Sequence, residues 1–211
     1  MDTRDSRGRP KAKPFGSPRS RTRKHQTTST SVPTDVPKNF LNNLGEMHTA
    51  EKELTRALPL VAKAARSEDL KTLLEIHLKQ TKGHVKILEA VAESLGEKLP
   101  KKSCKQMTRL IGEGVKVIAK RLVSGEKDQE LIGVGQKIEQ FEIDNYTPLC
   151  DEAKRREYTH EFALLKSVLD QEKLANELLG ALGQGKGPLD KLVKKVVLEH
   201  AGADIAAAEA A

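Results

Sequence analysis

The segment IHLKQTKGHVKILEAV, residues 76–91, puts polar side chains where a helix would be expected to present an apolar face. His77 and Gln80 are three residues apart, and Gln80 and His84 are four apart, so the three side chains can point to one patch of a helix. Two imidazoles in such a setting are either hydrogen-bonded core histidines or ligands of a metal ion. The choice depends on what the other helices bring to the same depth.

Carboxylates interrupt the apolar stripes of the other long helices. Glu51, Glu142 and Glu172 each stand near the middle of such a stripe, and Glu139 lies one helical turn before Glu142. Any single one is easily explained as an edge residue whose carboxylate reaches water. Several at a similar depth favour a common metal site, because a buried carboxylate without a partner is costly. The predicted ligands are Glu51, His77, Gln80, His84, Glu139, Glu142 and Glu172.

The ligand types indicate which ion to expect. A carboxylate-rich site with one or two imidazoles suits iron or manganese better than structural zinc, which prefers cysteine and histidine. Balancing about four carboxylates takes two cations. The sequence therefore predicts a di-metal centre of iron or manganese. Tyr146, one turn after Glu142, is expected to be a packed aromatic residue with a hydrogen-bonded hydroxyl, and beside iron it could also take part in redox chemistry.

Four long helices are expected to position these residues. Asp35 is the expected N-cap of the first helix and Ser67 that of the second. Almost no loop separates the members of each pair, so each pair should be an antiparallel hairpin. About 30 residues join the second helix to the third and contain a shorter, glycine-weakened helix. One long crossover of this kind is typical of the ferritin-like four-helix bundle, the predicted all-α fold. The long helices are predicted over 36–66, 68–95, 128–157 and 159–183.

The net charge of the chain lies in its N-terminal segment. The 211-residue chain is formally +7, and residues 1–25 hold six Arg and three Lys against two Asp, which leaves 28 basic and 28 acidic residues for the remainder. A segment so poor in apolar residues cannot bury enough surface to fold. The predicted domains are a disordered basic arm (1–34), the ferritin-like bundle (35–183) and a C-terminal tail with a short helix (184–211). The arm either binds nucleic acid non-specifically through phosphate contacts or serves only as a solubilising tail.

Composition limits the remaining function classes. The chain has no Trp and few other aromatic residues, which together with many Lys, Glu, Leu and Ala favours an all-α protein with an aliphatic core. Cys104 and Cys150 form no C-x-x-C pair, so no disulfide scaffold is expected. The sequence shows neither an apolar run of about 18 residues nor a secretory h-region. A cytoplasmic protein without a membrane span is therefore expected.

Four segments resemble the YciE/YciF-type family of ferritin-like proteins, a mostly bacterial, stress-associated group without an established activity. The resemblance covers roughly residues 36–183, in order, through AEKELTRALP, HLKQTKGHVKILE, KIEQFEIDNYTPL and LDQEKLA. It implies a bundle related to rubrerythrins, a homodimer and a di-metal centre. The matching ligand positions that it implies are Glu51, His77, Glu139, Glu142 and Glu172.

The sequence departs from that family at two positions. Gln80 and Gln171 stand where the family usually has Glu, and Gln is a neutral, weaker ligand. With one negative charge fewer, the site would hold metal more weakly, hold one ion, or hold none. His84 could compensate for the missing carboxylate.

Three functions are compatible with these features. The first is a ferritin-like stress protein whose iron or manganese pair reacts with peroxide or dioxygen, or oxidises ferrous iron. The second is a non-enzymatic dimeric helical stress protein whose basic arm, residues 1–25, binds nucleic acid. The third is a helical interaction module in which the polar core residues only fix the register of the helices. The residue types alone do not decide whether the protein is an enzyme.

Overall fold

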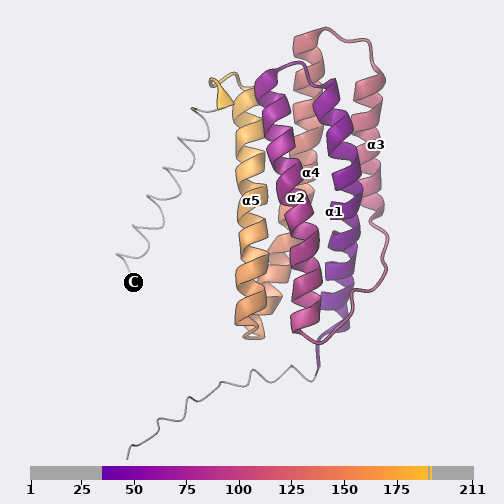
Figure 1. Cartoon of the computed structure of the whole chain (residues 1–211), viewed down its shortest axis with the longest axis vertical. Helices are drawn as coiled ribbons and strands as arrows, with labels where there is room; N and C mark the ends of the chain where they lie inside the picture. Colours follow the sequence, from indigo (N-terminus) through magenta and orange to yellow (C-terminus); the bar gives the residue numbers. More distant parts are fainter. Residues whose placement is uncertain (1–34, 190, 192–211) are drawn as a thin grey trace, which may run out of the picture. The chain divides into compact units, whose positions relative to one another are not determined.

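The computed structural model describes residues 35–189 and Lys191, so the predicted basic arm and most of the predicted tail lie outside the described residues. Over these residues the chain is all-α, with five helices and no strand (Figure 1). The prediction of an all-α bundle with a short helix in its crossover is confirmed. The helices are α1 (Lys38–Ala64), α2 (Glu68–Ser94), α3 (Lys105–Ala119), α4 (Ser124–Arg155) and α5 (Thr159–Gly183).

A tight turn joins α1 to α2. Ser67 is the N-cap of α2, and its side-chain oxygen accepts a hydrogen bond from the Leu70 N–H at 3.4 Å. The carboxylate of Asp128 on α4 accepts hydrogen bonds from the N–H groups of Arg66 and Ser67 at 2.9 and 2.7 Å. The predicted cap at Ser67 is thus confirmed, and the turn is fixed to the second hairpin.

The start of α1 differs from the prediction. Pro37 is the N-cap, and no side chain caps the helix, so the predicted cap at Asp35 is wrong. A residue that precedes proline disfavours the helical conformation, and Val36 instead buries its side chain in the core. Pro59 and Pro148 lie inside α1 and α4, and both helices continue through them.

The crossover leaves α2 through a glycine turn. Gly96 has a φ of 73°, a left-handed conformation that only glycine adopts without strain. Its N–H bonds to the Glu93 carbonyl at 2.9 Å, which closes the end of α2. The chain then passes over α1 at Gly45, where a Cβ atom would clash with the Pro100 backbone. The glycine at position 45 therefore lets the crossover lie close against the bundle.

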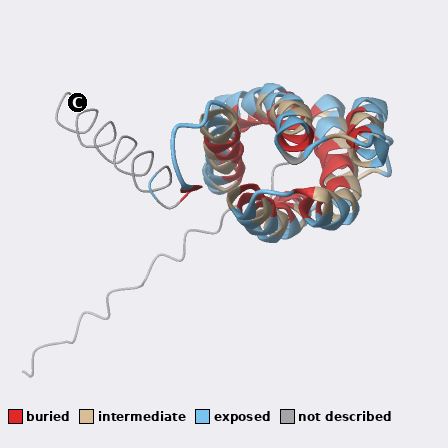
Figure 2. Ribbon diagram, turned by 90° about the horizontal axis from the view of Figure 1, so that it is seen from above, coloured by how far each residue is buried: buried red, intermediate tan, exposed pale blue. Residues whose placement is uncertain are grey.

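The four long helices form a bundle in which neighbouring helices run antiparallel, and α3 lies outside it (Figure 1). The pairs α1–α2 and α4–α5 pack most extensively, and they meet through α2–α5 and α1–α4 contacts. Helix α3 packs on α1 and α4 and carries the chain back along the bundle. Viewed from above, the buried residues line the inward faces of the helices (Figure 2). Polar residues on these faces therefore meet in the interior.

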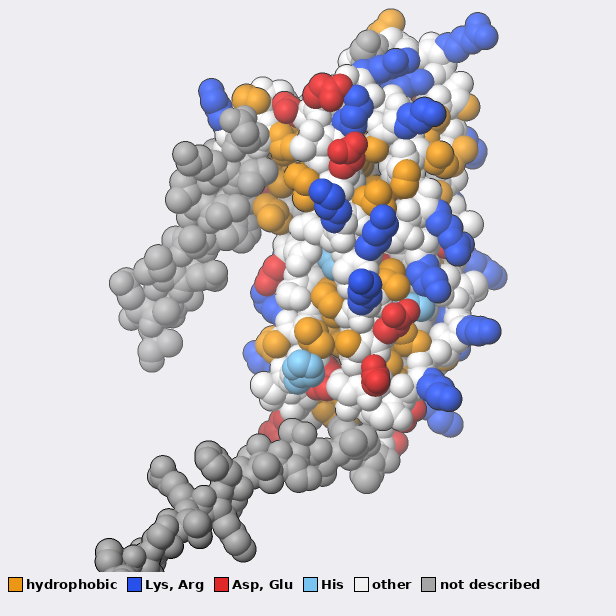
Figure 3. All heavy atoms as spheres, in the orientation of Figure 1, with side chains coloured by type: hydrophobic (Ala, Val, Ile, Leu, Met, Phe, Trp, Pro, Cys, Tyr) orange, Lys and Arg blue, Asp and Glu red, His pale blue; other side chains and the backbone are white. Residues whose placement is uncertain are grey.

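One face of the bundle carries side chains of both charges. On the face shown in Figure 3, Lys and Arg side chains are spread over the helices, with acidic and apolar side chains between them. None of the described helices combines the length and the apolar character needed to cross a bilayer.

Candidate metal centre

Six of the seven predicted ligands lie in the core of the bundle. They come from α1, α2, α4 and α5, and none is more than 4% exposed. The seventh, Gln80, is half-buried. The six buried residues are Glu51, His77, His84, Glu139, Glu142 and Glu172.

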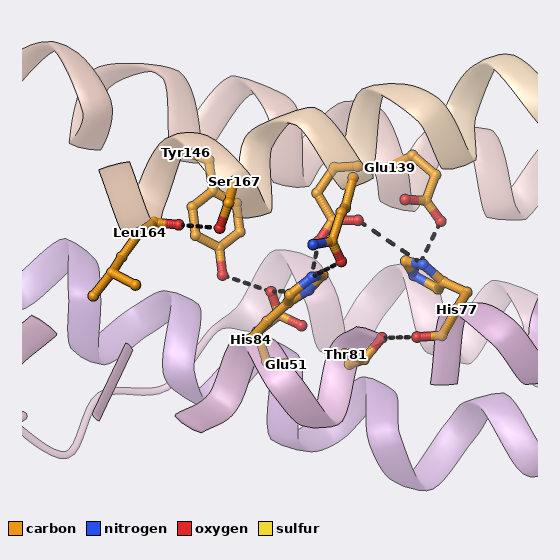
Figure 4. Close-up of polar contacts among 10 residues, drawn as sticks. Glu51, His77, Thr81, His84, Glu139, Tyr146, Leu164 and Ser167 are labelled. Carbon is orange, nitrogen blue, oxygen red and sulfur yellow. Dashed lines mark hydrogen bonds and ion pairs between the residues drawn. The ribbon is translucent and has the colours of Figure 1, made fainter. Parts of the chain in front are cut away.

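One group of potential ligands consists of His77, Glu139, Glu142 and Glu172. One donor atom from each lies within 4.8 Å of the donor atoms of the others. The Nε2 atom of His77 is 3.3 Å from Glu139 Oε1 (Figure 4). Its Nδ1 atom is 4.0 Å from Glu172 Oε2. Three carboxylates around one imidazole form a donor set that suits iron or manganese.

A second group consists of Glu51, His84 and Glu172, within the same distance limit. His84 Nδ1 lies 2.9 Å from Glu172 Oε1 and 3.6 Å from Glu51 Oε1. On the other side of the ring, His84 Nε2 is 3.1 Å from Gln171 Oε1. The Tyr146 hydroxyl donates a hydrogen bond of 2.6 Å to Glu51 Oε1 (Figure 4). Because Glu172 belongs to both groups, its carboxylate joins them into one site.

Many donor atoms of these groups have no hydrogen-bond partner within residues 35–189. Both carboxylate oxygens of Glu142 are unpaired, and so are one oxygen of Glu51, one of Glu139 and both ring nitrogens of His77. Buried polar atoms are paired in roughly nine of ten cases, so each exception needs an explanation. Apart from Asn176 Oδ1, all the unpaired side-chain atoms found in the described part of the chain belong to the two groups. These residues therefore fit a pair of cations.

Burial makes two of these carboxylates difficult to ionise. It raises the pKa of Glu139 and the pKa of Glu142 well above the usual value, and the charge of Glu172 adds to both shifts. Burial also raises the pKa of Glu51. A divalent cation bound here would displace the protons and stabilise the carboxylates in their charged form.

For His84 and Glu172, the contacts with other side chains together outweigh the effect of burial on the pKa values. Burial alone would raise the pKa of Glu172, but the 2.9 Å contact with His84 lowers it. Burial alone would lower the pKa of His84, but its contacts with the carboxylates of Glu172 and Glu51 raise it to about 10. In the metal-free protein His84 and Glu172 therefore form an ion pair, and metal binding at this group must remove the proton of His84.

Gln80 and Thr81 are the two other polar residues between His77 and His84 on the predicted inward face of α2. The Thr81 side chain is fully buried, and its hydroxyl donates to the His77 carbonyl at 2.8 Å (Figure 4). Burial lowers the pKa of His77, which favours the neutral form that binds metals. Gln80, three residues after His77 on α2, is only half-buried.

The family of this chain follows from its sequence as well as from its fold. Residues 35–188 match the family described as Domain of unknown function (DUF892). The chain belongs to this family. The matched region runs from the residues before α1 to just beyond α5, so it includes all six buried residues of the candidate centre. Protein YciF of Escherichia coli strain K12 is 35% identical over 135 residues, which cover 64% of this chain and 81% of YciF.

Two solved structures are similar to this member of the DUF892 family. The crystal structure of the E. coli stress protein YciF matches with a TM-score of 0.69 and 32% identity, over 72% of this chain and 97% of that one. YcfI from Rhodopseudomonas palustris matches with a TM-score of 0.66 and 26% identity, over 72% of this chain and 96% of that one. The predicted membership of a YciF-type family is therefore confirmed.

Two contacts in the centre could not be predicted from local spacing. The expected hydrogen bond of the Tyr146 hydroxyl is confirmed, but its partner, Glu51, is 95 residues away in sequence. The contact between Gln171 and His84 spans 87 residues. For Gln171 a signal existed, because it adjoins Glu172 in the segment that resembles the family.

Proposed function

We propose that this protein binds two iron or manganese ions in its core and uses them in a stress response, in a reaction with peroxide, dioxygen or ferrous iron. The observation that carries the proposal is the set of buried, unpaired carboxylate oxygens and imidazole nitrogens contributed by four helices. Glu172 would contact both ions, because it belongs to both groups. The description of the E. coli relative as a stress protein supports the physiological part of the proposal.

The chain's own residues would hold the metal pair, and they are buried in the core of the bundle. When bound, the metal pair supplies the redox chemistry and the electrophilic binding of the oxidant. The hydrogen bond from Tyr146 orients Glu51 through one oxygen and leaves the other oxygen for a cation. Leu54 and Leu88, one helical turn beyond Glu51 and His84, are buried and add apolar surroundings beside the second group. His84 can also hold a proton when the second ion is absent.

Metal analysis tests the proposal directly. The untagged full-length protein would be purified anaerobically, loaded with ferrous iron and compared with the Glu51→Ala/Glu142→Ala variant. We expect about two irons per chain in the wild type and a nearly complete loss in the variant. The matched control is Glu161→Ala, because Glu161 is also buried but its carboxylate accepts a hydrogen bond from Ser94 at 2.6 Å outside the centre.

Two results of this experiment would count against the proposal. Less than about 0.2 iron or manganese per chain in a folded wild type would mean that the substitutions at Gln80 and Gln171 have abolished the site. Equal metal content in the wild type and in the double variant would place the metal elsewhere. If iron is bound as expected, consumption of hydrogen peroxide by the loaded protein is the first reaction to measure, with the double variant as the blank.

A second proposal concerns the basic N-terminal segment. Residues 1–25 account for the whole formal net charge of +7, which supports salt-dependent, sequence-independent binding to nucleic acid. The resemblance to the YciF-type family also leads us to propose a cytoplasmic homodimer. Deletion of residues 1–30 should abolish DNA retardation at low salt and leave the number of chains per particle, measured by sedimentation analysis, unchanged. Unchanged retardation would refute the role of the segment in DNA binding.

A further inference from the structure

An apolar pocket lies between α1, α3 and α4, and its lining does not include the hydrogen-bonded residues Glu51, His84 and Tyr146 at the second group. Its volume is about 340 Å³, and aliphatic side chains from all three helices line it. Pockets that hold small molecules are mostly apolar, contain a few polar groups and start at about 300 Å³. Its lining includes Arg56, Ala57, Leu60, Gly114, Val115 and Glu139.

The pocket extends from the surface to the candidate metal centre. Leu60 and Val115 line it and are 58% and 51% exposed, and they are two of the four large hydrophobic side chains that are exposed among the described residues. Glu139 lines it as well and is only 3% exposed. Because Glu139 belongs to the first group of metal ligands, a molecule that fills the pocket would reach that group.

The pocket exists partly because α3 carries a glycine where a side chain would fit. A Cβ atom at Gly114 would lie 3.7 Å from Val134 Cγ1, an ordinary contact distance, so packing does not require glycine there. Glycine inside a helix is less favourable than alanine. The space left by Gly114 belongs to the pocket, which makes this position a direct way to fill it.

The charges around the pocket indicate what kind of molecule fits. Arg56 is exposed, is the one cationic residue that lines the pocket, and forms no ion pair with any residue in the described part of the chain. Glu53 at the same rim accepts a hydrogen bond of 2.8 Å from the Thr108 hydroxyl. An apolar cavity whose rim carries a guanidinium without an ion-pair partner in the described part of the chain complements an aliphatic chain that ends in a carboxylate.

We propose that this pocket binds a medium-chain aliphatic carboxylate, with its acid group at Arg56 and its methyl end directed toward Glu139. The proposed binding site depends only on the pocket. Any role of the bound aliphatic carboxylate at the metal centre rests in addition on the proposed function. A second copy of this chain that covers Leu60 and Val115 is the competing occupant. If the carboxylate occupies the pocket, its affinity should depend on the length of its aliphatic chain. If a second copy occupies the pocket, filling the pocket should instead lower the mass of the particle in solution.

Calorimetric titration of the full-length, chelator-treated protein with sodium decanoate below its micelle concentration tests the proposal. We expect saturable binding of one decanoate per chain, weaker by at least tenfold for hexanoate, since each buried methylene changes affinity about fourfold. Gly114→Leu should weaken decanoate binding by at least tenfold. Gly112→Leu is the matched control, because it makes the same change on the same helix outside the pocket, with no atom within 4 Å of its Cβ, and it should stay within about twofold of wild type.

Further measurements separate the possible explanations. Arg56→Gln should weaken decanoate binding several-fold and leave binding of 1-decanol unchanged. If Gly114→Leu does not fold, as judged by circular dichroism, Ala57→Phe fills the same pocket from α1. No saturable binding to the wild type would overturn the proposal, as would equal effects of the two glycine variants. A particle mass that is halved by Gly114→Leu would also overturn it and would assign the pocket to a second copy. Decanoate binding without metal binding would reject only the proposed function.

Discussion

Replacing Glu142 by leucine should stabilise the metal-free protein and remove its response to metal. Both carboxylate oxygens of Glu142 are buried without a hydrogen-bond partner among the described residues. An unsatisfied buried polar group costs about 1–3 kcal/mol, and leucine has a similar volume and no polar atoms. In chelator we therefore expect Glu142→Leu to raise the free energy of unfolding by about 2 kcal/mol, which corresponds to about 4–8 °C for a domain of this size.

Metal should reverse this order of stability. A ligand present at 100 times its Kd stabilises the folded state by about 2.7 kcal/mol, so Mn²⁺ should raise the unfolding temperature of the wild type and leave that of the variant nearly unchanged. Differential scanning calorimetry in chelator and in Mn²⁺ measures both effects. Glu161→Leu is the control, because its carboxylate accepts the Ser94 hydroxyl at 2.6 Å, and it should destabilise the protein by about 1–2 kcal/mol in both conditions.

Two outcomes would refute the reasoning. If Glu142→Leu destabilises the metal-free protein, the carboxylate has a stabilising partner, and the argument from unpaired oxygens fails. If the variant is more stable in chelator but Mn²⁺ stabilises neither protein, the buried carboxylates do not serve as metal ligands. The polar core residues would then only fix the register of the helices.

Three further predictions concern the same centre. Tyr146→Phe should lower the stability of the metal-free protein by about 1–2 kcal/mol, since it leaves Glu51 Oε1 without its 2.6 Å hydrogen bond; urea unfolding measures this. Gln80→Glu should raise the affinity for Mn²⁺ by about tenfold in calorimetric titration, because it adds a negative charge beside the first group; unchanged affinity would place Gln80 outside the site. Because the pKa values of Glu139 and Glu142 are raised in the folded protein, their contribution to stability is present below about pH 4.5 and is lost as the pH rises toward the folded values. In chelator the wild type should therefore lose stability relative to Glu139→Gln/Glu142→Gln between about pH 5 and pH 8, and a constant difference across this range would contradict the assigned shifts.

The helices and their connections were predictable because local spacing determines them. Apolar residues at intervals of three and four residues mark the inward face of each helix, and the predicted long helices agree with α1, α2, α4 and α5 to within a few residues. The start of α1 was the exception, because Asp35 is a good cap by residue type but Pro37 sets the first position from which the helix can continue.

The depth of each polar residue was less predictable. Gln80 and Thr81 are adjacent on the same stripe, and the sequence favours neither as the inward residue. In the structure Thr81 is fully buried and Gln80 is half-buried, because the rotation of α2 about its axis is set by how it packs between α1 and α5. Spacing alone cannot choose between them, because both positions fit intervals of three and four residues between His77 and His84.

The amino-acid sequence alone was sufficient for the all-α bundle with its long crossover, and for the polar positions that interrupt its apolar faces. These features depend on the helical repeat and on the length of the connections, both of which can be read along the chain. Tertiary structure decided that Glu172 joins two ligand groups, that Tyr146 is bonded to Glu51, and that α3 leaves an apolar pocket over Glu139. The physical reason is that these contacts link residues far apart in sequence, whose distances depend on how whole helices are rotated and spaced against one another.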